Sequence, residues 1–115
     1  MTTANLVLTS LAHERKSYVL RKWHNGYEVG EFLKRLLEGW QDCDAAFGLE
    51  NVAEILTCGE EDFDYEVVKE KEGNGKIKTG FETIDTNWTW SCVLINEKEA
   101  LITGSNGSQV EVYKV

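Results

Sequence analysis

Proline is absent from the 115 residues of the sequence. Its absence excludes proline-rich linkers and leaves no prolyl isomerisation to slow folding. The chain also lacks any apolar run of the roughly 18 residues that a membrane-spanning helix needs. Its first residues carry neither the positive region nor the long apolar core of a signal peptide. We therefore expect a cytoplasmic protein that binds no membrane, located in the host cytoplasm if a phage encodes it.

Cysteine is scarce, with Cys43, Cys58 and Cys92 as the only three. A small secreted scaffold would carry an even and denser set of cysteines. We expect all three to be reduced thiols that act as small buried hydrophobes.

Metal-binding patterns are also missing. Asp42 and Asp44 resemble the first two ligands of an EF-hand loop, but Phe47 replaces the glycine that the turn needs. Ala53 stands where the bidentate glutamate would be. Zinc would need Cys and His residues at short spacing, and the Cys and His residues of this sequence are not spaced in that way. We expect no metal and no cofactor.

The usual catalytic motifs are absent, because the sequence contains no nucleophile elbow, P-loop or dinucleotide-binding glycine pattern. His13 or His24 could meet a cysteine only through the fold, and no local pattern supports such a pair. A non-enzymatic role is therefore favoured. A small enzyme or a ligand-binding α+β cup, with a deep pocket lined by His24 or a cysteine, remains an alternative.

Positive charge is absent from residues 38–66, which contain ten carboxylates, while the whole chain has a net charge of −8. The acidity is thus concentrated in one block of the sequence. The ten are Glu38, Asp42, Asp44, Glu50, Glu54, Glu60, Glu61, Asp62, Asp64 and Glu66.

Apolar spacing predicts helices at about 9–24, 28–42 and 49–58. The second is the clearest, because its apolar residues repeat at helical spacing from Val29 to Trp40. The first is ambiguous: strands at 6–11 and 17–23 would fit nearly as well. Helix is favoured there.

From Phe63 onward the apolar period changes to two, which is typical of strands. Asn-Gly pairs at 74–75 and 106–107 predict hairpin turns. The second turn would place Leu101 opposite Val112. We therefore predict an α+β fold in a single domain, 1–115, with N-terminal helices packed on a C-terminal antiparallel meander of four or five strands.

The acidic block is the best candidate for a functional surface, because uncompensated carboxylates speed encounter with a basic partner. In size, charge and lack of catalytic motifs the chain is similar to anti-CRISPR and anti-restriction inhibitors and to nuclease-immunity proteins. We expect a basic partner such as a nuclease or another nucleic-acid-binding complex. The candidate partner-binding residues are Glu60, Glu61, Asp62, Asp64, Glu66, Asp42, Asp44, Phe63 and Tyr65.

Two other interpretations remain. A regulatory or assembly module could bind through an exposed Trp88 and Trp90 face of the sheet, so both a monomer and a homodimer are considered. Direct binding of nucleic acid is not expected, because the net negative charge repels a polyanion. A nucleic-acid-binding surface would consist of the cations Arg15, Lys16, Arg21, Lys22, Lys34 and Arg35, interleaved with the aromatic residues Tyr18 and Trp23.

Overall fold

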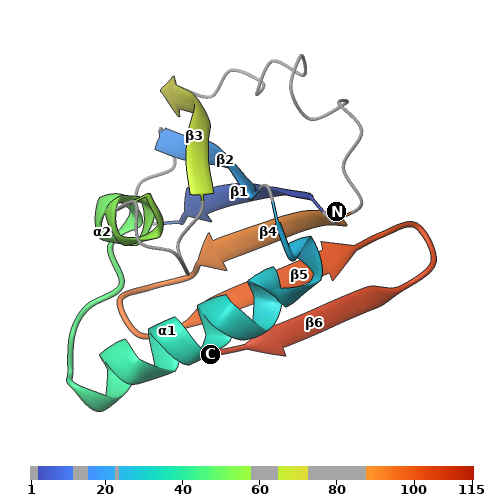
Figure 1. Ribbon diagram of the computed structural model, residues 1–115. Coiled ribbons are helices and arrows are strands. Elements are labelled where there is room, and N and C mark those ends of the chain that lie inside the picture. The colour runs from blue at the N-terminus through green and yellow to red at the C-terminus, as the bar shows by residue number, and fades with distance from the viewer. Residues whose placement is uncertain (1–2, 12–15, 23, 58–64, 73–87) are drawn as a thin grey trace.

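The computed structural model describes residues 3–11, 16–22, 24–57, 65–72 and 88–115, and for residues 16 and 65–72 it describes the backbone. In this part of the chain six strands form one mixed sheet, in the order β3-β2-β1-β4-β5-β6 (Figure 1). The strands are β1 Ala4–Ser10, β2 Lys16–Lys22, β3 Tyr65–Glu72, β4 Trp88–Leu94, β5 Ala100–Ser105 and β6 Val110–Lys114. The helices are the short 3-10 helix η1 Gly26–Glu28, α1 Val29–Asp42 and α2 Leu49–Leu56.

The predicted helix at 9–24 is wrong, because the described part of this segment contains the end of β1 and all of β2, which pair antiparallel. Leu6 pairs with Leu20 and Leu8 with Tyr18, so four large side chains line one face of the hairpin. Alternation of burial in β1 matches the strand period of two. Both β1 and β2 are interior strands with a neighbouring strand on each side. An interior strand is buried by its neighbours in the sheet and by what packs on the faces, which favours a strand over a helix that would bury only one apolar stripe.

The α+β class is correct, and four described strands follow residue 60. Only β4, β5 and β6 form the expected antiparallel meander. The sheet is mixed because β1 lies beside β4 and runs parallel to it, from Ala4 opposite Trp88 to Ser10 opposite Leu94. A parallel pair needs a long crossover connection, and the chain between β1 and β4 contains both helices.

The helices predicted at 28–42 and 49–58 are confirmed as α1 and α2. Both pack on the same face of the sheet and share one hydrophobic core with it. Val29, Leu33 and Leu37 are the fully buried large residues of α1. No helix in the described ranges is long and apolar enough to cross a membrane.

The hairpin of β5 and β6 is confirmed, but its register differs from the predicted one. Leu101 lies opposite Lys114 instead of Val112. Gly107 takes the positive φ of 94°, and the Asn106 side chain accepts hydrogen bonds from the backbone N–H groups of Ser108 and Gln109. The turn is therefore centred one residue later, which moves the register by two and leaves every side chain on its expected face. The turn predicted at 74–75 lies outside the described residues.

Trp90 is the centre of the core and is fully buried. A Cβ added to Gly30 of α1 would lie 2.4 Å from the Trp90 ring, and one added to Gly104 of β5 would lie 2.2 Å from it. The indole Nε1–H donates a 2.8 Å hydrogen bond to the carbonyl of Gly26. The ring also stacks on Trp88 with centroids 5.2 Å apart. Helix, sheet and η1 are thus positioned around one side chain.

We predict opposite effects for two alanine substitutions in α1. Gly30→Ala should lower the free energy of unfolding by about 1–3 kcal/mol, because the new methyl group overpacks the Trp90 site. Gly39→Ala should raise it by about 0.5–1 kcal/mol, since nothing lies within 4 Å of that position and alanine favours the helix. Urea denaturation of both variants measures the difference. Equal effects at the two positions would show that the Trp90 ring does not restrict the size of the side chain at position 30.

Candidate functional site

The predicted partner-binding residues fall into three groups in the structure. Glu60, Glu61, Asp62, Phe63 and Asp64 lie outside the described residues. Tyr65 and Glu66 begin β3, at the edge of the sheet. Asp42 and Asp44 are exposed at the C-terminal end of α1.

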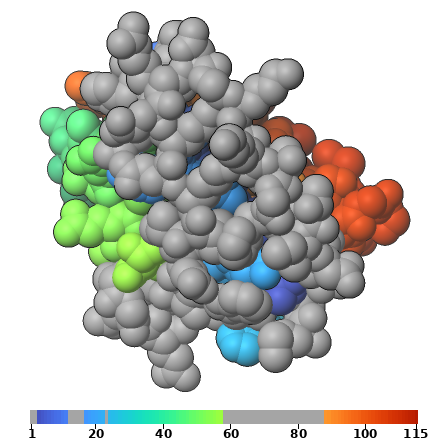
Figure 2. Space-filling model, turned by 90° about the horizontal axis from the view of Figure 1, so that it is seen from above, coloured from blue at the N-terminus to red at the C-terminus, as the bar shows by residue number. Residues whose placement is uncertain are grey.

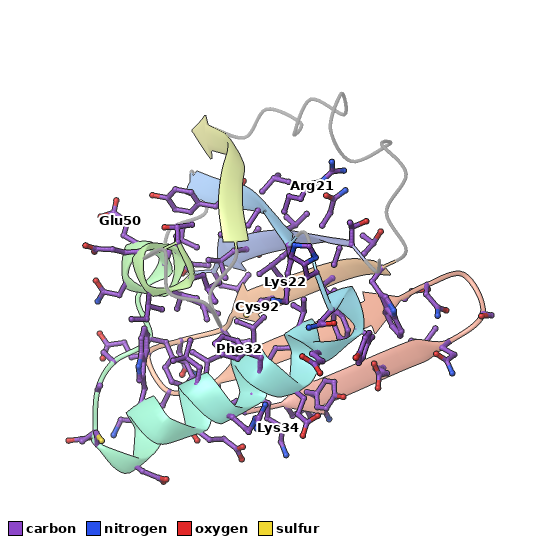
Figure 3. The ribbon with its side chains drawn as sticks, in the orientation of Figure 1. Arg21, Lys22, Phe32, Lys34, Glu50 and Cys92 are labelled. Atoms are coloured by element: carbon purple, nitrogen blue, oxygen red, sulfur yellow. The ribbon has the colours of Figure 1, made fainter. Side chains whose placement is uncertain are left out.

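The basic residues of β2 lie beside part of the acidic block. The strand register places Glu66 directly opposite Arg21 and Tyr65 opposite Lys22. Arg21 and Lys22 are only 5% and 8% exposed. They do not contribute to an exposed cationic surface, whereas Lys34 and Arg35 lie on the outer side of α1 and are more accessible. Figure 3 shows Lys34 pointing away from the sheet.

The end of α1 has a backbone conformation that aspartate tolerates but glycine prefers. Asp44 takes a left-handed φ of 57°. The N–H of Ala45 donates to the carbonyl of Trp40 over 2.8 Å, and that of Asp44 donates to Gln41 over 3.0 Å. These two bonds form a Schellman motif, in which glycine usually occupies the left-handed position. The last turn of α1 contains no basic residue, so Asp42 and Asp44 stand unfavourably at the negative end of the helix dipole.

The loop between β4 and β5 is attached to the connection between α1 and α2. The backbone N–H of Phe47 donates to the carbonyl of Glu97 over 2.8 Å. Gln41 Nε2 donates to the Lys98 carbonyl over 2.5 Å, and Lys98 Nζ lies 3.0 Å from Asp44 Oδ1. Segments more than fifty residues apart in the sequence thus form one surface.

This contact brings two carboxylates from outside the acidic block, Glu97 and Glu99 of the loop between β4 and β5, next to it. Both are exposed, as are Glu50 and Glu54, which belong to the acidic block and lie on α2. Figures 1 and 2 show the loop, α2 and the connection after α1 at the same end of the molecule. Glu50 points outward from α2 (Figure 3). We call this surface the acidic end, consisting of Asp42, Asp44, Glu50, Glu54, Glu97 and Glu99.

Sequence reasoning singled out Asp42 and Asp44 as candidate partner-binding residues, but it did not identify Glu97 and Glu99 as their neighbours. The polar run from Asn96 to Glu99 signals a loop between two strands. It does not reveal which helix end that loop will meet, because that depends on the strand order. Lys98 offsets part of the charge, and its contact with Asp44 is largely exposed and contributes little to stability.

The described cysteines differ in their accessibility. Cys92 lies in the core beneath the helices, and its burial raises the pKa of the thiol to about 12. Because a thiol is nucleophilic only as the thiolate, Cys92 is not an activated nucleophile. Cys43 is exposed, contrary to the expectation of a buried thiol, because it follows the last turn of α1. Within the described ranges no three His, Cys, Asp or Glu side chains are grouped as metal ligands would be.

We predict that thiol reagents distinguish these two cysteines. In a Cys58→Ser chain at pH 8, Cys43 should react within minutes and Cys92 should react only after denaturation, since its thiol stays protonated and covered. Mass spectrometry of the labelled native protein measures the sites. Labelling of Cys92 in the native state would contradict its position in a closed core.

We also predict that Asp44→Gly raises the free energy of unfolding by about 0.5–1 kcal/mol, because glycine adopts the left-handed conformation without strain. Asp44→Asn removes the same charge while keeping a side chain that tolerates this conformation. Asp44→Asn should change the free energy of unfolding by less than about 0.5 kcal/mol. It removes a charge that the helix dipole disfavours, but it also removes the contact with Lys98, and the two effects offset each other. Equal gains from both variants in urea denaturation would assign the effect to charge.

The chain matches no protein-family profile, and no curated protein or solved structure is significantly similar to it.

Proposed function

We propose that this chain is a small acidic binding protein whose acidic end docks into a basic groove of a nucleic-acid-handling protein and inhibits it. The observation that carries the proposal is the attachment of the loop between β4 and β5 to the end of α1. It adds Glu97 and Glu99 to the surface of Asp42 and Asp44. Carboxylates from three segments are held on a scaffold of helix and sheet rather than on a single loop.

Electrostatics gives such a surface a specific use. A negative field from several carboxylates accelerates encounter with a Lys- and Arg-rich groove and fixes the orientation of docking. Nucleic-acid-binding grooves carry this positive charge because they neutralise phosphates. A protein that occupies the groove with carboxylates competes directly with the polyanion.

The location of the charge also supports binding over a purely solubilising role. Asp42 and Asp44 stand where the helix dipole disfavours negative charge, and Asp44 occupies a position where glycine would be more stable. Residues that oppose local stability are typical of surfaces selected for interaction. The predicted residues from Glu60 to Glu66 belong to the same proposal, as a second acidic segment.

The proposal predicts steeply salt-dependent capture of a basic nucleic-acid enzyme from host lysate. The test variant replaces Asp42, Glu50, Glu54, Glu97 and Glu99 with their amides. Because each of these side chains is exposed, the fold should be retained. A second variant neutralises Glu60, Glu61, Asp62, Asp64 and Glu66. A control neutralises two carboxylates away from the acidic end, Glu28 and Glu31, which are exposed at the opposite end of α1.

The expected result is capture by the wild type and the control, and loss of at least tenfold in association rate for the first variant. The captured enzyme should release its nucleic acid when the wild-type protein is added. Loss only with the second variant would move the site to residues 60–66. Undiminished binding by both neutralised variants would rule out the electrostatic mechanism.

A module that binds through its Trp88 and Trp90 face is not supported, because both rings are buried beneath the helices. The sheet can be contacted instead on its opposite face, where Val110 and Val112 of β6 are exposed.

A further inference from the structure

The outer side of β6 is an unpaired sheet edge in the described part of the chain. β6 is the last strand of the sheet and pairs on its inner side with β5. Ala100 and Val115 exchange both backbone hydrogen bonds, at 3.1 and 3.0 Å. In an antiparallel ladder such pairs alternate, so Glu111 and Tyr113 also bond inward. The N–H and C=O groups of Val110, Val112 and Lys114 therefore point outward.

Two large apolar side chains are exposed at this edge. Val110 is 74% exposed and Val112 57% exposed, on the face of the sheet opposite the helices. Proteins protect exposed edges with proline, bulges, inward charges or very short strands. Here the chain contains no proline, the register of β5 and β6 is unbroken, and Lys114 is the charged residue among the three outward positions.

The geometry points to a homodimer in which the β6 strands of two copies pair antiparallel, with Val112 on the two-fold axis. This inference is independent of the proposed function. Outward groups can pair only with outward groups, so the strands can shift only in steps of two residues. Centring on Val112 places Val110 opposite Lys114 of the second copy and Glu111 opposite its Tyr113. A shift to centre on Glu111 would place two carboxylates opposite each other, which is unfavourable.

The distribution of charge permits this arrangement despite the net charge of −8. The loop between β4 and β5 precedes β5, and the 106–109 turn follows it, so they lie at opposite ends of that strand. Antiparallel pairing places the acidic end of one copy beside the 106–109 turn of the other. The acidic ends therefore lie far apart, and two copies would form one continuous sheet of twelve described strands.

Sedimentation velocity across about 1 µM to about 1 mM tests the dimer. The wild-type mass should rise from one chain to two with concentration. Val112→Lys should remain monomeric, because two lysines would meet at the axis. Thr89→Lys is the control, since it adds the same charge at an exposed position of the interior strand β4. A wild type that stays monomeric throughout, or a Val112→Lys variant that dimerises equally well, would overturn the proposal.

Cross-linking tests the register in a chain with Cys43 and Cys58 changed to serine. Val112→Cys should form a disulfide-linked dimer on mild oxidation, since directly opposite Cα atoms lie about 5.5 Å apart. Val110→Cys should cross-link poorly, although residue 110 is the more exposed, because its two copies would be about 14 Å apart. Faster cross-linking of Val110→Cys would exclude this pairing. If the chain stays monomeric and binds another protein through β6, the edge pairs with a strand of that protein and the dimer is excluded.

Discussion

The close approach of the Trp90 ring to two glycines is the constraint on which the rest of the structure depends. Gly30 brings α1 against the ring from one side, and Gly104 brings β5 against it within the sheet. The hydrogen bond from Nε1 to Gly26 satisfies the indole N–H, which would otherwise be costly in a closed core. Since α1 is fixed at its N-terminal end by these contacts, the position of its C-terminal end is fixed too, 14 residues along the helix.

At the C-terminal end of α1 the negative charge of Asp42 and Asp44 lowers the stability of the helix. The Schellman motif ends α1 with good backbone hydrogen bonds, but it does so with Asp44 in the left-handed position and without a basic residue in the last turn. Lys98 reaches this end from the loop between β4 and β5 and offsets part of the cost. The hydrogen bonds from Phe47 to the carbonyl of Glu97 and from Gln41 to that of Lys98 hold this loop, with Glu97 and Glu99, in place. The acidic end is thus tolerated because a rigid core on the other side of α1 stabilises the helix independently of its last turn.

The sequence predicted what local patterns determine and missed what strand order determines. The helix α1 and the meander from β4 to β6 could both be predicted from the apolar spacing of short segments. Asp42 and Asp44 stay candidate residues, which the charge pattern alone indicates. The hairpin of β1 and β2 could not be distinguished from a helix, because its decisive neighbour, β4, is about eighty residues away in the sequence. Likewise, Glu97 joins the acidic end through a backbone bond to Phe47 that no periodicity indicates. The turn error was smaller, because a register shift of two preserves the face of every residue.

Strand order also separates the two surfaces that we propose. β5 is the link between them, since the loop that precedes it contributes Glu97 and Glu99 to the acidic end and the strand that follows it, β6, carries Val110 and Val112. A change in either surface can therefore leave the other intact, because β5 itself is held by Ile102 and Gly104 in the core. In a dimer paired through β6 the two acidic ends would face away from each other. Each could then engage its own basic groove, and two grooves on one assembly would be bound with higher avidity than a single one.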